Sequence, residues 1–181
     1  MQSLSKFPQT IKTSRLVLRT VAPTIENAKK FFCIINQNRE FLEEWQGHIE
    51  YLRNMDDVLK NLEFRYAQIA KDEGILFGIY CDGDLIGRIR FFIDPEYGCE
   101  LGAWLVQNAT GKGYMSEALV ALEKELFKFG FDKITLDIDD GNTKSENVAK
   151  RNGYKFVKRL PMASWAKRVG KCDSLIYEKP L

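Results

Sequence analysis

The segment LVQNATGKGYMSEALVALEKELFKF, residues 105–129, joins an apolar strand to an amphipathic helix through two glycines, and this junction decides the fold. Apolar residues recur at helical spacing up to Phe129, and Gly130 follows as a helix end. The first N–H groups of a helix lack intrahelical partners and carry partial positive charge. Gly111 and Gly113 remove side chains there and Lys112 adds a cation, so the turn suits a phosphate. A tight turn without a ligand explains the same glycines equally well.

The spacing of these glycines narrows the kind of phosphate site. A P-loop requires GxxxxGK followed by Ser or Thr, whereas Gly113 follows Lys112 here, which argues against a nucleoside triphosphatase. A dinucleotide fingerprint requires a third glycine, and Ser116 occupies that position. Because Asp137 lies in the next strand, where a ribose-binding acid is expected, dinucleotide binding remains a weaker alternative.

Composition indicates a globular chain without an obvious macromolecular charge partner. The 181 residues are 45% apolar and 29% charged with a net charge of +2, which predicts one domain over residues 1–181 and gives no reason to expect nucleic acid binding. No signal peptide or membrane-spanning run is found, so we expect a cytoplasmic protein. The four cysteines are widely spaced and His48 is the only histidine, so we expect reduced thiols and no metal site.

The remaining pattern predicts an α/β (α+β mixed) fold. Helical periodicity is found at 22–38, 39–47, 55–69, 114–129 and 142–152, and extended runs at 14–20, 75–81, 84–94, 99–106, 133–139, 155–161 and 173–180. Asp82-Gly83 closes a hairpin, whereas a helix separates strands 99–106 and 133–139 and makes them a parallel pair. We therefore expect a mixed, largely antiparallel sheet of about seven strands with helices on both faces. The last two strands should form a hairpin around a longer connection.

Two segments together, ELGAWLVQNATGKGYMSEAL and ITLDIDDGNTKSENVAKRNGYKF, resemble the GNAT superfamily of acetyl-coenzyme A dependent N-acetyltransferases. With TSRLVLRT near the N-terminus and NREFLEEW after the first helix, the chain resembles the ribosomal-protein N-terminal (alanine/serine) acetyltransferase branch over essentially its whole length. The resemblance implies a single GNAT-like domain whose parallel central strands splay apart. It also implies acetyl-coenzyme A as co-substrate and no metal.

The resemblance also implies where the coenzyme binds. The family's Gln/Arg-x-x-Gly-x-Gly/Ala turn maps onto residues 108–113, departing from the pattern at Asn108. The backbone of residues 104–106 is expected to pair with the pantetheine arm. The implied coenzyme-binding residues are Trp104, Leu105, Val106, Asn108, Thr110, Gly111, Lys112, Gly113, Tyr114, Met115 and Asn142.

Acetyl transfer to an amine needs a neutral nucleophile, a donor for the developing oxyanion and a proton for the leaving thiolate. The resemblance implies that Glu100 removes the amine proton, commonly through water, and a main-chain N–H near Val106 is the simplest oxyanion donor. Many members of the superfamily use a tyrosine where this chain has Ala149, so Ser145 is expected to supply the thiolate proton instead. The alternatives are a solvated surface role for Glu100 and a helix N-cap role for Ser145.

The predicted function is direct acetyl transfer to an amine, such as the N-terminal α-amine of a ribosomal or other protein. A small amine, such as a polyamine or aminoglycoside-like acceptor, is the alternative within the same enzyme class. A non-catalytic acyl-coenzyme A binding protein is the alternative outside it, favoured by Asn108 and Ala149. Either a monomer or a homodimer is compatible with the sequence, and no membrane partner is expected.

Overall fold

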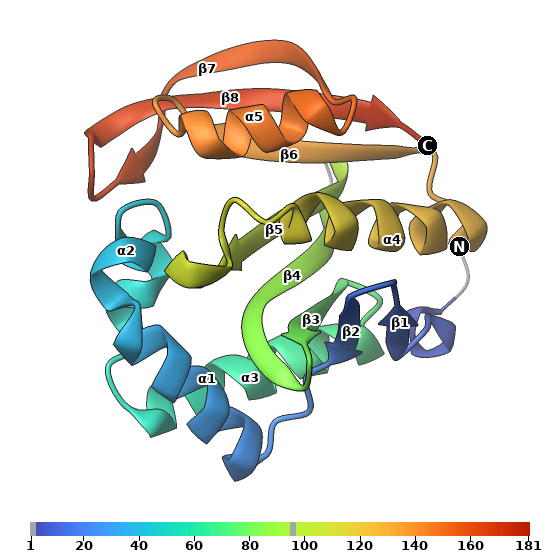
Figure 1. The fold of residues 1–181 in the computed structure, drawn as a ribbon. Helices are drawn as coiled ribbons and strands as arrows, with labels where there is room; N and C mark the ends of the chain where they lie inside the picture. Colours follow the sequence, from blue (N-terminus) through green and yellow to red (C-terminus); the bar gives the residue numbers. More distant parts are fainter. Residues whose placement is uncertain (1–2, 95–96) are drawn as a thin grey trace.

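The computed structural model describes residues 3–94 and 97–181, which form an eight-stranded sheet flanked by helices (Figure 1). The spatial order of the strands is β1-β2-β3-β4-β5-β6-β8-β7. The strands are β1 (Thr10–Lys12), β2 (Leu16–Thr20), β3 (Gly74–Cys81), β4 (Asp84–Asp94), β5 (Gly98–Leu105), β6 (Lys133–Asp139), β7 (Lys155–Ala166) and β8 (Gly170–Pro180). All neighbours pair antiparallel except β5 and β6, so the mixed, largely antiparallel sheet with a parallel central pair is confirmed.

Five α-helices and three short 3-10 helices complete the described part of the chain. They are α1 (Ile25–Gln37), α2 (Arg39–Glu43), α3 (Met55–Ala70), α4 (Tyr114–Phe129), α5 (Thr143–Arg151), η1 (Leu4–Lys6), η2 (Gly47–Tyr51) and η3 (Gln107–Ala109). Thr24 caps α1 as predicted, and Asn54 with Asp57 forms a capping box at α3. The helix predicted over 39–47 ends earlier, and Gly47 instead begins η2.

The count of about seven strands was one short. β1 pairs antiparallel with β2, matching Ile11 with Leu18. The strand has three residues, of which Ile11 alone is buried, so it is too short to show the alternating pattern by which strands are recognised.

The final hairpin also differs from expectation, because β7 and β8 extend until Ala166 pairs with Gly170. The connection is therefore tight rather than long. Pro161 hid the continuity of β7, since proline has no N–H to donate to a ladder. It lies where the pairing with β8 shifts register between Leu160 and Ser164, and such an irregularity tolerates proline.

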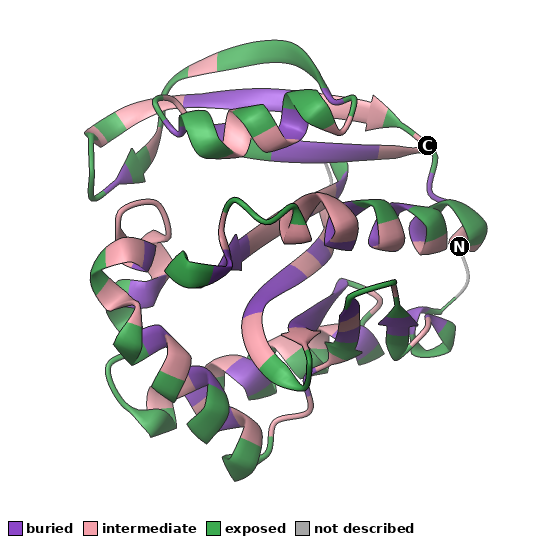
Figure 2. Ribbon diagram, viewed as in Figure 1, coloured by how far each residue is buried: buried purple, intermediate pink, exposed green. Residues whose placement is uncertain are grey.

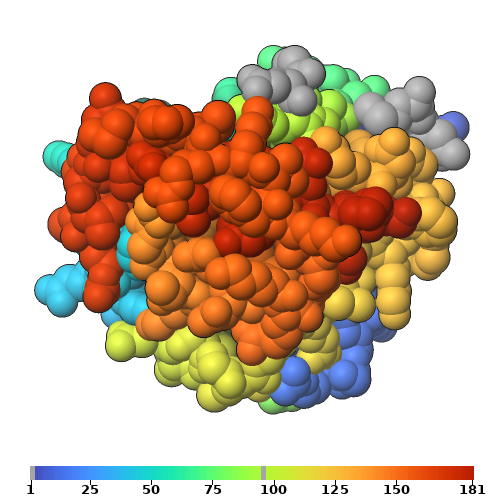
Figure 3. Space-filling model, turned by 90° about the horizontal axis from the view of Figure 1, so that it is seen from above, coloured from blue at the N-terminus to red at the C-terminus, as the bar shows by residue number. Residues whose placement is uncertain are grey.

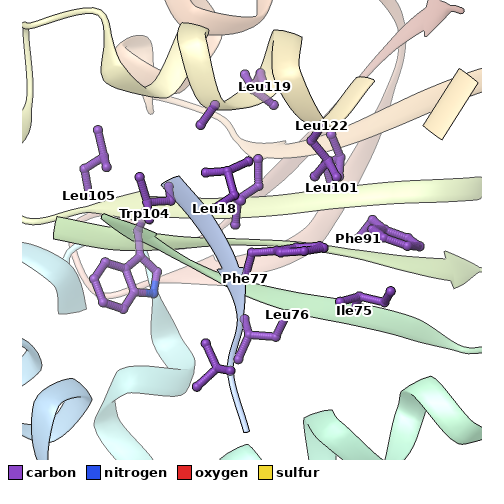
Figure 4. Packing of buried hydrophobic residues seen from close by; sticks show 14 of the residues in the cluster. Leu18, Ile75, Leu76, Phe77, Phe91, Leu101, Trp104, Leu105, Leu119 and Leu122 are labelled. Atoms are coloured by element: carbon purple, nitrogen blue, oxygen red, sulfur yellow. The ribbon is translucent and has the colours of Figure 1, made fainter. Parts of the chain in front are cut away.

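The helices cover both faces of the sheet, as predicted. α4 packs against β1, β2 and β5, and α5 packs beside it on β6, whereas α1 and α3 pack together against β3 and β4. Buried residues follow the inner strands, while β7 at the sheet edge is mostly exposed (Figure 2). Leu105 extends toward α4 and Trp104 toward the opposite face (Figure 4), which is the alternation expected of successive strand residues.

The parallel pair opens toward its carboxyl end. Pairing between β5 and β6 covers Cys99 with Ile134, Glu100 with Thr135 and Leu101 with Leu136, and then stops. β5 nevertheless continues to Leu105 and β6 to Asp139. The strands are therefore splayed beyond Leu101, and the sequence on either side of this opening leads into α4 and α5.

The outer surface at the far end of the sheet comes from the C-terminal part of the chain. Seen from above in Figure 3, α5 and the β7–β8 hairpin make up much of this face. No helix within the described ranges is long and apolar enough to cross a membrane.

Candidate active site

The turn before α4 has the geometry of an anion site. Gly113 is the N-cap of α4 with φ 80°, and Gly111 has φ 77°, so both adopt the left-handed conformation that favours glycine. No side chain of the described residues caps the α4 N-terminus. A Cβ added at Gly111 would meet nothing within 4 Å, so the space beside the turn is open. The free N–H groups of the first helical turn are therefore available to an anion.

Arg15 lies beside this turn, and the sequence analysis missed it. Its guanidinium donates to the Lys112 carbonyl at 3.0 Å, packs over the Tyr114 ring at 4.6 Å and pairs with Glu117 at 2.7 Å. Glu117 also accepts hydrogen bonds from Thr13 and Ser14; these bonds and those from Arg15 outweigh burial and lower the pKa of its carboxyl to about 2. The segment before β2 is thereby fastened to the first turn of α4, with a cation next to the glycines. Arg15 reaches this turn through a contact with a residue about 100 positions away in the chain, and no local sequence pattern indicates such a contact.

The opening between β5 and β6 exposes backbone groups of β5. The Val106 N–H is not free, because it donates to the Ile86 carbonyl at 2.9 Å. Hydrogen-bonding direction alternates along a strand, so the Leu105 N–H and carbonyl face the opposite side, where pairing with β6 has ended. Leu105, rather than Val106, therefore offers an unpaired donor to a group lying in the opening, and by the same alternation Ala103 offers another.

Glu100 stands at the closed end of this opening. Burial raises the pKa of its carboxyl to about 7, with a further increase from nearby Asp137 and Asp94 and a decrease from Arg90. Among the described residues, Glu100 makes no salt bridge, and the surface role considered above does not match its partial burial. A carboxyl with a pKa of about 7 is suited to exchange protons near neutral pH.

Asp137 gives the site a second carboxyl. It lies on β6 two residues after Thr135, the partner of Glu100, and burial raises its pKa as well, opposed by a hydrogen bond from Ser174. The sequence analysis considered Asp137 only as a ribose-binding acid. Its influence on Glu100 depends on the parallel register of β5 and β6, which the sequence does not give.

The N-cap of α5 is Asn142, not Ser145 or an adjacent position. The Asn142 side-chain oxygen accepts the Ser145 N–H at 3.2 Å, which places Ser145 in the third position of the helix. The Ser145 hydroxyl has no protein partner in the described ranges, so it is not occupied by capping. Asn142 is buried with its oxygen used by the cap, which leaves its amide nitrogen to donate.

Ala149 has no hydroxyl, and the hydroxyl of Tyr154 does not face the opening. Ala149 is fully buried. Tyr154 donates to Glu123 at 2.8 Å inside the protein, and burial followed by the charge of Glu123 raises the pKa of the tyrosine. A proton donor from α5 would therefore come from its first turn.

The predicted coenzyme-binding residues extend from the end of β5 to the start of α4, whereas the two predicted catalytic residues lie apart from each other. Trp104, Leu105 and Val106 are buried on β5 and just beyond it, Asn108 lies on the exposed side of η3, and Thr110 bonds its hydroxyl to the Gln107 carbonyl at 2.8 Å. Tyr114 and Met115 begin α4 and are half-buried. Glu100 lies at the closed end of the opening and Ser145 beyond its open end. The structure does not bring these two together, so a joint role at one reacting carbon requires at least one of them to act through water.

Residues 15–155 match the family model of the acetyltransferase (GNAT) domain. A ribosomal-protein-serine acetyltransferase of Escherichia coli (strain K12) is 28% identical over 150 residues, covering 81% of this chain and 83% of that protein.

Solved structures share the fold. RimL, a ribosomal-protein α-N-acetyltransferase in complex with coenzyme A, has a TM-score of 0.88 at 19% identity, covering 95% of this chain and 98% of that one. The microcin C7 self-immunity acetyltransferase MccE, in complex with acetyl-coenzyme A and AMP, has a TM-score of 0.87 at 23% identity over 99% of both chains. RimJ of Mycobacterium smegmatis, in complex with a coenzyme A disulfide, has a TM-score of 0.84 at 19% identity over 96% and 88%.

Proposed function

Since the chain belongs to the acetyltransferase (GNAT) family and is, as expected, an acetyl-coenzyme A dependent N-acetyltransferase, we propose that it acetylates the N-terminal α-amine of a protein or peptide. The observation that carries the proposal is the splayed end of β5 and β6, which leads at one side into the uncapped N-terminus of α4 and holds Glu100 at its closed end. These features offer one continuous path for a long, anionic acyl donor and a base at its end.

The coenzyme end is supplied by backbone. The first N–H groups of α4 and the cations of Lys112 and Arg15 hold the diphosphate, and Gly111 and Gly113 leave room for it. The Leu105 N–H and carbonyl pair with the pantetheine arm in the place of a β6 strand. The amide of Asn142 donates from the other side of the opening.

The chemical step uses few side chains. Glu100, ionised, takes the proton of the attacking amine directly or through one water, and its pKa of about 7 lies near that of an α-amine, roughly 7.7 to 8.0. A main-chain N–H of β5 beyond the paired stretch, that of Ala103 being nearer to Glu100 than that of Leu105, stabilises the oxyanion that develops on the thioester carbonyl. The Ser145 hydroxyl donates a hydrogen bond to the departing thiolate and passes it a proton, which solvent replaces on the hydroxyl.

An α-amine is preferred over lysine as acceptor for a physical reason. A lysine amine has a reference pKa of about 10.4, so near neutral pH it is almost wholly protonated, whereas an α-amine is partly neutral. A carboxyl like Glu100 is a sufficient base for the α-amine and a poor one for lysine. Similarity to the ribosomal-protein-serine acetyltransferase supports the same assignment.

The test measures coenzyme A release with a thiol reagent across peptides with free N-termini, the same peptides with blocked N-termini, polyamines and an aminoglycoside. We expect release with the free N-termini alone. Release with polyamines or the aminoglycoside, and none with peptides, would replace the proposal with small-amine acetylation. Binding of acetyl-coenzyme A with no release for any acceptor would indicate a non-catalytic protein.

A further inference from the structure

Four basic side chains gather on the face of the sheet covered by α1 and α3. Arg88 and Arg90 lie two residues apart on β4 and so point to the same face, which is also that of Trp104, the partner of Arg88. Arg65 reaches them from α3, and His48 from η2. Gly102 pairs with Arg90 and has no side chain, so the Arg90 guanidinium extends over it toward Glu100.

None of these cations forms a salt bridge with a carboxylate in the described part of the chain, although Arg90 lies near Glu100. Arg88 is only 7% exposed, and its hydrogen bond is to the His48 ring. Neither Arg65, Arg88 nor Arg90 forms a salt bridge within residues 3–94 and 97–181. A buried charge without a counterion is unfavourable, so such a cluster is expected to pair with a negative group from elsewhere.

The positive charges of the cluster repel one another. Burial is the main cause that lowers the pKa of Arg88 to about 9, and the charges of Arg90 and Arg65 lower it further. Burial and the charge of Arg65 lower the pKa of Arg90 to about 10, while the carboxylate of Glu100 acts in the opposite direction. Both remain cations at neutral pH. Burial and the three arginines lower the pKa of His48 to about 2, so its ring is neutral and accepts the bond from Arg88.

A donor next to the cluster lacks an acceptor. Trp104 is 5% exposed, and its indole Nε1 has no hydrogen-bond partner among the described residues. The indole lines a cavity of about 10 Å³ together with Arg88 and His48, and Figure 4 shows it directed away from the α4 side. Asn61 lines the same cavity, and Arg65, one helical turn later, has a buried Nε that also lacks a partner. The cavity admits about one water-sized group, such as a single oxygen atom.

We propose that Arg65 and Arg90 bind an anionic group, a carboxylate or a phosphate, carried by the acceptor close to its reactive amine, with one oxygen of that group reaching the cavity beside Arg88 and Trp104. The inference rests on the proposed function. Arg90 and Glu100 are diagonal neighbours across β4 and β5, a separation of roughly 7–8 Å between Cα atoms. An extended peptide advances about 3.4 Å per residue, so the anion belongs on the first or second residue of the acceptor.

The test compares peptides that differ in one charge. Three octapeptides begin with Ser-Asp, Ser-Asn or Ser-phosphoserine and are otherwise identical. Calorimetry measures their binding to the protein loaded with coenzyme A. We expect the Asp peptide or the phosphoserine peptide to bind at least about tenfold more tightly than the Asn peptide, because charge-assisted hydrogen bonds are the stronger kind. The tighter of the two identifies the anion.

Variants assign the preference to the cluster. Arg90→Gln and Arg65→Gln should each reduce the preference severalfold, whereas Arg19→Gln, an exposed arginine on β2, should retain it. Arg88 is avoided because its burial makes a folding defect the expected result, and melting temperatures check that each variant folds. Equal binding of all three peptides, or a preference unchanged in both cluster variants, would overturn the inference.

Turnover is measured separately with acetyl-coenzyme A on the same peptides. Acetylation without any charge preference leaves the proposed function intact and removes the anion site. If the peptides bind with a charge preference but are not acetylated, the anion site is supported and the assignment as an N-terminal acetyltransferase fails.

Discussion

The two ends of the candidate site are built differently. The proposed coenzyme end consists mainly of backbone donors at the start of α4 and along β5, within residues 105–115, and its special positions are glycines. The proposed acceptor end consists of side chains from η2, α3, β4, β5 and β6, among them His48, Arg90 and Asp137. A backbone site depends on local sequence and tolerates variation at Asn108, whereas a side-chain site depends on the whole sheet and sets specificity.

The largest effect is expected at the coenzyme end, from Gly113→Leu. A side chain at φ 80°, with its Cβ 3.5 Å from Arg15, strains the turn and occupies the anion's place. Calorimetry should show coenzyme affinity falling on the order of a hundredfold or more. Gly130→Leu, at the other end of α4 with φ 103° and nothing within 4 Å of the added Cβ, is the matched control and should retain coenzyme binding. Equal losses in both variants would mean that helix strain, not the anion site, is responsible.

At the acceptor end, Glu100→Gln should reduce kcat about a hundredfold, a typical effect of removing a general base. Because Glu100 lies away from the α4 turn, the Kd for acetyl-coenzyme A should not change. Steady-state kinetics and calorimetry measure the two quantities, with the exposed Glu26→Gln as control. An unchanged kcat would remove Glu100 from the mechanism.

A smaller effect separates two roles in the first turn of α5. Asn142→Ala should lower the free energy of unfolding by about 1 kcal/mol through loss of the cap, whereas Ser145→Ala should leave stability nearly unchanged. Ser145→Ala should instead reduce kcat about tenfold, since a thiolate with a reference pKa of about 8.5 leaves with modest assistance. Chemical denaturation and kinetics together check both. Stability lost at Ser145 with no change in rate would contradict the assignment.

The smallest predicted effect is a shift in the pH profile. Glu100 must be ionised to act as a base, and its pKa of about 7 is raised partly by Asp137. Asp137→Asn removes that negative charge, so the Glu100 pKa falls and the rise of kcat/KM with pH moves to lower pH. The acceptor amine titrates identically in both proteins, so the difference reports on Glu100. A large loss of kcat/KM at every pH would instead show that Asp137 itself takes the proton.

The sequence was informative about those features of the candidate site that depend on neighbouring residues in the chain. Gly111, Gly113 and the helix after them were recognisable because glycine at these positions has a direct conformational reason. Arg15 was missed because it reaches the turn through tertiary contacts, and the Arg65, Arg88 and Arg90 cluster because its members come from α3 and β4. Ser145 was considered as a cap although Asn142 performs that role, since both residue types are good N-caps.

The most direct test of the account is a crystal structure with acetyl-coenzyme A bound. The account predicts diphosphate oxygens within about 3.2 Å of backbone nitrogens at the start of α4. It also predicts the acyl arm beside Leu105 and the thioester near Glu100, with β5 and β6 parted beyond Leu101. Diphosphate bound at another surface, or β5 and β6 paired along their full length around an acyl arm lying elsewhere, would contradict it.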